Sequence, residues 1–338
     1  MRAFLAAALL FLPAPAAVPL DVKGGYYLSG GANITADAAV LQNMESMTTY
    51  RSIADDFTFP GYQKQWVNDL GAGVDRNFAL ELKHYGHAAG QQTVGGVVVP
   101  APSMTIQQRP GTTWPKAYGY EQVTTGKVDP LLKRALDQLK AMPHNATVNI
   151  QIASEFDTDH EFGTTENGVA YTWAQSDARA VTAVKYIIGY FRSHGLPAGV
   201  TFSIGTAGFD RASFQRLHPE SLRPDVQVLQ WNAYNHGAAR TPYQVFQRTR
   251  AWAIADLPTW RDKEVVIAEW GTAVSLGNQA TWIAGVDEAV TQINTDGQGF
   301  TLGTLNYFNS DPDWGTLNPK QAGLEALRTV YTASPFAD

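Results

Sequence analysis

The sequence predicts an α/β fold, a single-domain (β/α)8 TIM barrel. Strand-like runs alternate with helix-like runs along the whole chain, and this pattern gives parallel strands joined by crossover helices. The length of 338 residues and the hydrophobic content of 44% suit a barrel, which usually takes about 250 residues plus insertions. An open doubly wound sheet is the alternative, but no glycine-rich phosphate loop follows the first strand-like run.

Runs of apolar or β-branched residues are the predicted strands. They are 25–29, 49–54, 78–83, 148–155, 200–205, 226–234, 265–269 and 301–308. The segments 148–152 and 265–268 are almost uninterrupted apolar runs, as expected for strands that are covered on both faces.

Helix-like runs lie between the strands. They are 36–47, 130–142, 176–193, 242–254, 279–293 and 319–331. In 180–191 apolar residues recur at three- and four-residue spacing, which is typical of a helix that packs one face. Gly195 with Pro197 is predicted to end one helix, and Gly297 another.

The segment 90–127 interrupts this alternation after the third strand. It is rich in Gly, Pro, Thr and Gln and contains Val97-Val98-Val99. We expect a hairpin or long loop over one rim of the barrel, and loops of this length are usually functional.

The N-terminus resembles a secretory signal peptide. Arg2 precedes an apolar run at 3–12, and Ala14-Pro15-Ala16 fits a small-x-small cleavage site. We therefore expect a signal peptide at 1–21, a catalytic barrel at 22–338 and a secreted protein. The alternative is an apolar N-terminal arm in a phage virion or cell-surface assembly. No run is long enough to span a membrane stably.

Composition narrows the class of ligand. The net charge of −6, without a Lys/Arg run, argues against nucleic acid. Aromatic residues reach 11%, with nine Trp, and aromatic faces stack well on sugar rings. The absence of cysteine excludes disulfides and thiolate chemistry. No cofactor and no metal site is predicted.

Two glutamates follow predicted strands at their carboxyl ends. Glu155 follows the fourth strand and Glu269 the seventh, and barrels place catalytic groups at this end. Glycoside hydrolysis needs such a pair, one carboxyl group protonating the leaving oxygen while the other attacks the anomeric carbon. For either residue alone, an ion pair or a helix cap is the competing interpretation.

Several segments resemble glycoside hydrolase family 26, in the clan of barrel glycosidases with the acid/base on strand four and the nucleophile on strand seven. The resemblance runs from about residue 147 to 320. The segments that carry it are 225–235 (Asp-Val-Gln-Val-Leu-Gln-Trp-Asn-Ala-Tyr-Asn), 267–271 (Ile-Ala-Glu-Trp-Gly), 306–309 (Asn-Tyr-Phe-Asn), Asp313-Trp314, and 171–173 with the helix that follows.

The resemblance implies a retaining glycosidase acting on β-linked polysaccharide, with endo action expected rather than exo. Glu155 would be the acid/base and Glu269 the nucleophile, with Tyr234 hydrogen-bonded to Glu269. The implied substrate-binding residues are His84, Asp157, Trp173, Trp231, Asn232, Trp270 and Trp314.

The sequence departs from the family at four places. Ser154 stands where the family has His before the acid/base, and Phe156-Asp157 where it has Asn-Gly after it; Gln151 stands where the family has Arg, and Asn232 where it has Asp. The family's typical substrate, β-mannan, is therefore not assumed.

Two other functions fit parts of the sequence. The run 157–161 partly resembles that of family 18 chitinases, in which Glu161 would be the acid, although Thr158 and His160 are polar where that run is apolar. A barrel that binds polysaccharide without cutting it, as in a phage tail or an adhesion component, is the non-enzymatic alternative.

Overall fold

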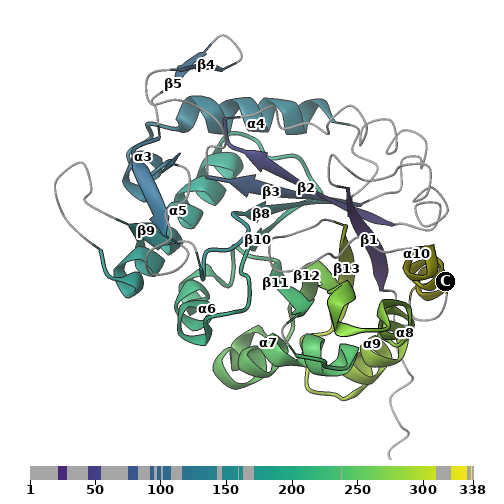
Figure 1. The fold of residues 1–338 in the computed structure, drawn as a ribbon. Helices are drawn as coiled ribbons and strands as arrows, with labels where there is room; N and C mark the ends of the chain where they lie inside the picture. Colours follow the sequence, from purple (N-terminus) through teal and green to yellow (C-terminus); the bar gives the residue numbers. More distant parts are fainter. Residues whose placement is uncertain are drawn as a thin grey trace, which may run out of the picture.

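A computed structural model describes residues 22–28, 45–54, 75–82, 92–94, 97–99, 102–107, 116–142, 147–158, 160–162, 171–236, 238–309, 321–332 and 336. It confirms the predicted (β/α)8 barrel (Figure 1). The barrel strands are β1 (Lys23–Leu28), β2 (Ser46–Ser52), β3 (Asp75–Glu81), β8 (Val148–Ile152), β10 (Val200–Ile204), β11 (Val228–Asn235), β12 (Glu264–Thr272) and β13 (Leu302–Asn309).

The strands form one parallel sheet in the order β10-β8-β3-β2-β1-β13-β12-β11. Its two ends, β10 and β11, are consecutive in the chain. Backbone hydrogen bonds join them, from Gln227 N to Phe202 O (3.0 Å) and from Asn232 N to Thr206 O (3.2 Å). The sheet therefore closes on itself.

Helices surround the strands (Figure 1). They are α3 (Tyr120–Thr124), α4 (Asp129–Ala141), α5 (Trp173–Ser193), α6 (Arg211–Leu217), α7 (Pro242–Asp256), α8 (Gln279–Ala284), α9 (Val286–Thr295) and α10 (Gln321–Tyr331). Side-chain caps begin four of the described helices, because Thr172, Asp210, Thr241 and Asn278 each accept from the backbone N–H three residues on. No helix in the described part of the chain is long and apolar enough to cross a bilayer.

Two helix predictions differ from the structure. The run 279–293 is two helices, because Gly285 ends α8 and begins α9. Ser46 and Met47, expected at the end of a helix, are buried and begin β2, where they pair with β1. The rest of that predicted helix lies outside the described residues.

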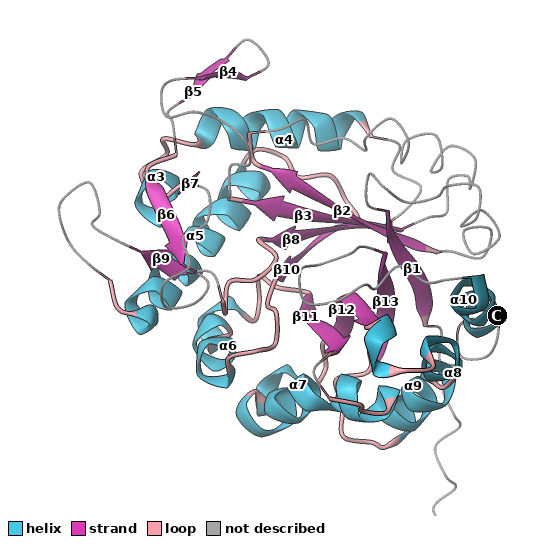
Figure 2. Cartoon of the chain, viewed as in Figure 1, coloured by secondary structure: helices cyan, strands magenta, loops and turns pink. Residues whose placement is uncertain are grey.

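The insertion after β3 carries a hairpin, as predicted. β4 (Gln92–Val94) pairs antiparallel with β5 (Val97–Val99). In a separate sheet, β6 (Met104–Gln107) pairs with β7 (Lys116–Ala117) and with β9 (His160–Phe162) (Figure 2). Since β9 follows β8 in the chain, the insertion is tied to the loop that follows Glu155.

The barrel interior holds a polar network where barrels usually carry branched apolar residues. Asn149 donates to Asn77 (2.7 Å) and to Ser203 (2.8 Å), and Asn77 donates to Gln151 (3.1 Å). Gln230 also donates to Gln151. These bonds cross-link β3, β8, β10 and β11.

Candidate active site

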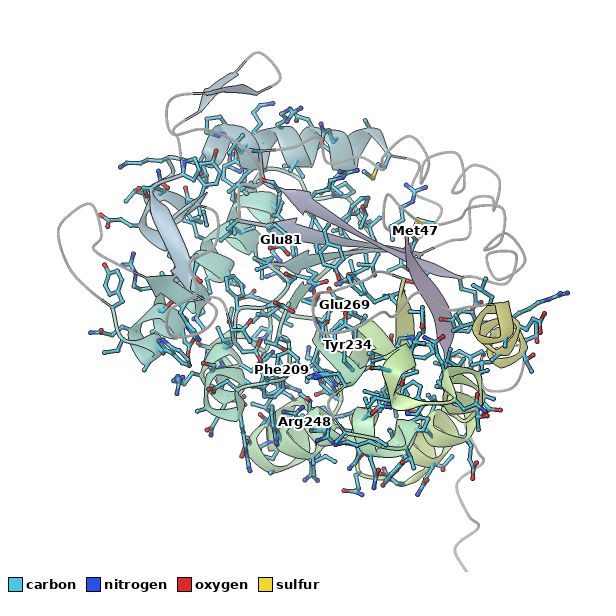
Figure 3. All side chains as sticks on the ribbon, in the orientation of Figure 1. Met47, Glu81, Phe209, Tyr234, Arg248 and Glu269 are labelled. Carbon is cyan, nitrogen blue, oxygen red and sulfur yellow. The ribbon has the colours of Figure 1, made fainter. Side chains whose placement is uncertain are left out.

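Glu269 lies near the carboxyl end of β12, buried and held by two tyrosines. Tyr50 from β2 donates its hydroxyl to Oε1 of Glu269, and Tyr234 from β11 donates to Oε2. Figure 3 shows Tyr234 and Glu269 side by side within the ring of strands. Burial, followed by the charge of Glu269, raises the pKa of Tyr234 well above 10. Its phenol is therefore a neutral donor, and the two hydroxyls orient the carboxylate.

Glu155 lies in the same barrel mouth. Asn232 on β11 donates from Nδ2 to Oε1 of Glu155 at 3.4 Å, and the Asn232 backbone is the register partner of Glu269 on β12. The charge of Glu155 also contributes to the raised pKa of Tyr234. The structure thus brings together four of the predicted site residues: Glu155, Asn232, Tyr234 and Glu269.

A tight backbone turn presents Glu155. Ala153, directly after β8, has a positive φ of 55°, a conformation that L-residues adopt at a cost. The turn packs on Gly205, where a Cβ atom would lie 1.9 Å from the carbonyl oxygen of Ala153. Backbone bonds from Phe156 to Gly205 and from Gly205 to Ile152 hold the arrangement. Only glycine at position 205 allows this approach.

Asp157 was predicted to bind substrate, and the structure contradicts this. The side chain is buried, and its carboxylate accepts from the backbone N–H groups of Ala207, Gly208 (2.8 Å) and Phe209 (3.1 Å). Burial raises the pKa of Asp157 to about 6, against the opposing effect of these donors. Asp157 therefore positions the loop after β10 and has no exposed oxygen for a sugar.

Trp231 and Trp270 were predicted to be sugar platforms, and this is wrong for both. Each is 0% exposed. Trp231 packs edge-on against Phe214 of α6, and Trp270 packs against Phe246 of α7. Both rings point out of the barrel into the helical layer, where no substrate reaches them.

Trp173 remains a candidate platform. It begins α5, is 39% exposed, and stacks on His160 with ring centroids 4.5 Å apart and an interplanar angle of 13°. His160 is buried beneath it, and its Nδ1 atom lies 3.3 Å from Oδ1 of Asp177. Asp177 also accepts from Arg216 of α6. A buried polar chain thus supports the ring from below.

The chitinase-like interpretation of Glu161 is wrong. Glu161 lies on β9, which pairs with Ile106 of β6 in a separate small sheet. The chitinase-like mechanism requires this residue on a barrel strand, and the backbone of Glu161 is not part of one. In the part of the chain that the structure describes, no group of three or more His, Cys, Asp or Glu could hold a metal ion.

The structure does not place two of the predicted site residues, and it adds one residue that the sequence did not predict. His84 and Trp314 lie outside the described residues. Tyr50 was not predicted. It is the second residue of the predicted strand 49–54, whereas the observed β2 runs from Ser46 to Ser52 and so puts Tyr50 near the carboxyl end, where catalytic groups collect.

The chain shares its fold with solved barrel glycosidases. No family model and no curated protein sequence matches it. The catalytic domain of a GH26 endo-β-1,4-mannanase from Bacillus sp. JAMB-750 is similar at a TM-score of 0.57 and 14% identity, covering 93% of this chain and 86% of that one. GH26C from Muricauda sp. MAR_2010_75 gives 0.56 and 12%, covering 94% and 87%.

A xylanase from another family is about as similar. The CBM22-1–GH10 modules of Clostridium thermocellum xylanase 10B, solved with xylohexaose, give a TM-score of 0.56 at 12% identity and cover 95% of this chain and 68% of that one. Members of different glycosidase families therefore resemble the chain to a similar degree. At these identities, what they show is the (β/α)8 barrel fold.

Proposed function

We propose that the chain is a retaining glycoside hydrolase that cleaves β-linked polysaccharide by double displacement. The observation that carries the proposal is the pairing of Glu155 and Glu269 through Asn232, at the ends of β8 and β12. The solved barrels that it resembles include enzymes named as a mannanase and a xylanase. A secreted protein with endo action, as the sequence suggests, would suit such a substrate.

In the first step Glu155 would donate its proton to the glycosidic oxygen while a carboxylate oxygen of Glu269 attacks the anomeric carbon. The bond to the leaving sugar breaks, and a glycosyl ester of Glu269 forms. Tyr50 and Tyr234 bind the two oxygens of Glu269, so the carboxylate is oriented before the substrate arrives.

In the second step the roles reverse. Glu155, now a carboxylate, would take a proton from water as the water oxygen attacks the anomeric carbon, and Glu269 is released. Asn232 donates to Glu155, which keeps that carboxyl group aimed at the leaving oxygen in one step and at the water in the other.

The test is reducing-sugar release from a panel of mannan, mixed-linkage glucan, xylan and acidic cell-envelope polysaccharides. We expect Glu269→Gln and Glu155→Gln to lower the rate about a thousandfold or more, because each removes a group that acts in the transition state. Glu288→Gln, which neutralises an exposed residue on α9, is the matched control and should keep the wild-type rate.

The non-enzymatic alternative gives a different result. A barrel that only binds polysaccharide would retain glycan and release no product, and Glu269→Gln would not change either observation. Release that persists in Glu269→Gln would also contradict the proposal, because it would place the chemistry elsewhere.

A further inference from the structure

A cluster of aromatic and basic side chains lies beside the candidate site, on the loops after β10 and β11 and on α7. Phe209 is 42% exposed, and the Arg248 guanidinium lies 5.8 Å from its ring centroid and 5.6 Å from that of Trp252. His236 packs edge-on to Phe209, with centroids 5.9 Å apart. With Arg240, these residues are called the Arg248 cluster below.

Fixed backbone connects the Arg248 cluster to the catalytic pair. Asp157 lies two residues after Glu155, and its carboxylate accepts from the backbone N–H of Phe209. The loop that carries Phe209 is therefore tied to the segment that carries Glu155. His236 directly follows β11, the strand that carries Tyr234. Gly208, directly before Phe209, lies against β11, because a Cβ atom there would be 3.4 Å from the carbonyl oxygen of Asn232. Phe209, Tyr234 and Arg248, which belongs to α7, are labelled in Figure 3. The cluster therefore flanks the mouth at a defined position.

The two arginines of the cluster lack an acidic partner among the described residues. The acids on neighbouring elements are engaged elsewhere. Asp210 caps α6 by accepting from Ser213 N at 2.7 Å, and Asp256 binds Arg211 at 2.7 and 2.8 Å.

The charges of these arginines influence one another. Partial desolvation against the rings, and then the charge of Arg240, lower the pKa of Arg248. The backbone places Arg240 at the end of β11, because its N–H donates at 3.2 Å to Oδ1 of Asn235, the residue directly before His236. An anion bound at Arg248 and Arg240 would be held by charge-assisted hydrogen bonds.

We propose that the Arg248 cluster is a subsite for an acidic sugar residue, so that the substrate is an anionic β-linked polysaccharide. The exposed ring of Phe209 offers a face for a sugar, and the guanidinium groups of Arg240 and Arg248 match the geometry of a carboxylate or sulfate. This inference rests on the proposed hydrolase function and names its substrate class.

The experiment compares a uronate-containing polysaccharide with the same polymer after chemical reduction of its carboxyl groups. We expect the wild-type kcat/KM to be about tenfold higher or more on the acidic form, the usual effect of a charge-assisted hydrogen bond. Arg248→Gln and Arg240→Gln should each reduce this preference severalfold, mainly through KM. A sulfated polymer serves as a further arm, and distinguishes a general anion subsite from one specific for carboxylate.

Arg328→Gln is the matched control, since it removes the same charge from an exposed position on α10. Arg328→Gln should keep the wild-type preference for the acidic polymer. If that preference falls as much in Arg328→Gln as in Arg248→Gln, it reflects the net charge of the protein and contradicts the subsite. Equal rates on the acidic and reduced polymers in the wild type would overturn the inference, as would an unchanged preference in Arg248→Gln.

The outcomes separate this inference from the proposed function. If the protein cleaves neutral polymers in a Glu269-dependent way and shows no preference for acidic ones, the hydrolase function is supported and the acidic-sugar subsite is contradicted. If no polymer is cleaved, calorimetric binding of acidic oligosaccharides to the wild type and to Arg248→Gln decides the matter. Binding that weakens in Arg248→Gln supports the subsite, and equal or absent binding contradicts it.

Discussion

Asn232 links the strand of one glutamate to the side chain of the other: its backbone is the register partner of Glu269, and its side-chain amide donates to Glu155 at 3.4 Å. The side chain of Asn232 donates to the acid/base, whereas Tyr50 and Tyr234 donate to the nucleophile. The position therefore offers a way to perturb Glu155 directly.

Replacement of Asn232 by Ala should lower kcat about tenfold to a hundredfold, because Glu155 loses a hydrogen bond that orients its charged form. Asn232→Asp, which sets a carboxylate against Glu155, should be worse than Asn232→Ala near neutral pH. Steady-state kinetics with thermal unfolding as a folding control checks both. A wild-type kcat in Asn232→Ala would show that the contact has no catalytic role.

Removal of either tyrosine hydroxyl at Glu269 should slow the reaction. Tyr50→Phe and Tyr234→Phe should each lower kcat by about ten- to a thousandfold, as expected when one donor to a reacting oxygen is lost. The double variant should lose less than the product of the two effects, since both act on one carboxylate.

The matched control for the tyrosines is Tyr186→Phe, which removes a hydroxyl that donates to Asp129 at 2.8 Å on a helix outside the barrel. It should keep the wild-type kcat. An equal loss in Tyr186→Phe would mean that the effect at Tyr50 and Tyr234 comes from destabilisation.

Gly205 supports the turn that presents Glu155. A methyl group there would lie 1.9 Å from Ala153 O and 2.6 Å from Gln151 Nε2. Gly205→Ala should therefore lower the free energy of unfolding by about 3 kcal/mol and abolish activity. Gly189→Ala on α5, where nothing lies within 4 Å, should instead stabilise the protein by about 0.5–1 kcal/mol. Urea unfolding measures both, and equal effects would contradict the packing argument.

His218 makes stability depend on pH. It is fully buried against Trp260, donates from Nδ1 to Phe214 O at 2.7 Å, and burial lowers its pKa from 6.5 to about 4. Between these values the unfolded chain binds the proton and the native chain does not. Stability should therefore fall by about 3 kcal/mol as the pH drops from 6.5 to 4.

The measurement is the difference in urea unfolding between the wild type and His218→Phe across that pH range. Taking the difference cancels the contributions of other groups that titrate there, such as Asp157. The wild type should lose more stability than the variant as the pH falls. If the free energies of unfolding of the wild type and His218→Phe changed in parallel with pH, the pKa of His218 would be the same in the native and unfolded chains, which would contradict the prediction.

The eight strands and the two glutamates could be predicted because each depends on local sequence. A short apolar run next to a helical run identifies a strand, and the residue at its carboxyl end follows directly. The insertion was also visible, as a break in that alternation at 90–127. Helix α6 was not, because its seven residues give too few turns for a periodic signal.

Strand parity directs the side chains of Trp231 and Trp270 toward the helices. Neighbouring residues on a strand point to opposite faces. Trp270 follows Glu269 directly, and Trp231 is three residues before Tyr234. If Glu269 and Tyr234 face the interior, both tryptophans must face the helices, as they do.

Asp157 and Tyr50 could not be placed from sequence alone, because their partners are distant in the chain. The backbone donors to Asp157 are about fifty residues away, and Tyr50 is 219 residues from Glu269. Only barrel closure brings β2 opposite β12. Tertiary structure therefore decides whether an acid holds a loop or faces a ligand.

The central claim is that Glu269 attacks the sugar, and covalent trapping tests it most directly. The probe is an activated 2-deoxy-2-fluoro glycoside of the sugar that the substrate panel identifies, because the fluorine slows release of a glycosyl ester more than its formation. Peptide mass mapping should find one sugar bound, on Glu269, and no label in Glu269→Gln. Label on another residue, or turnover without any covalent intermediate, would contradict the account.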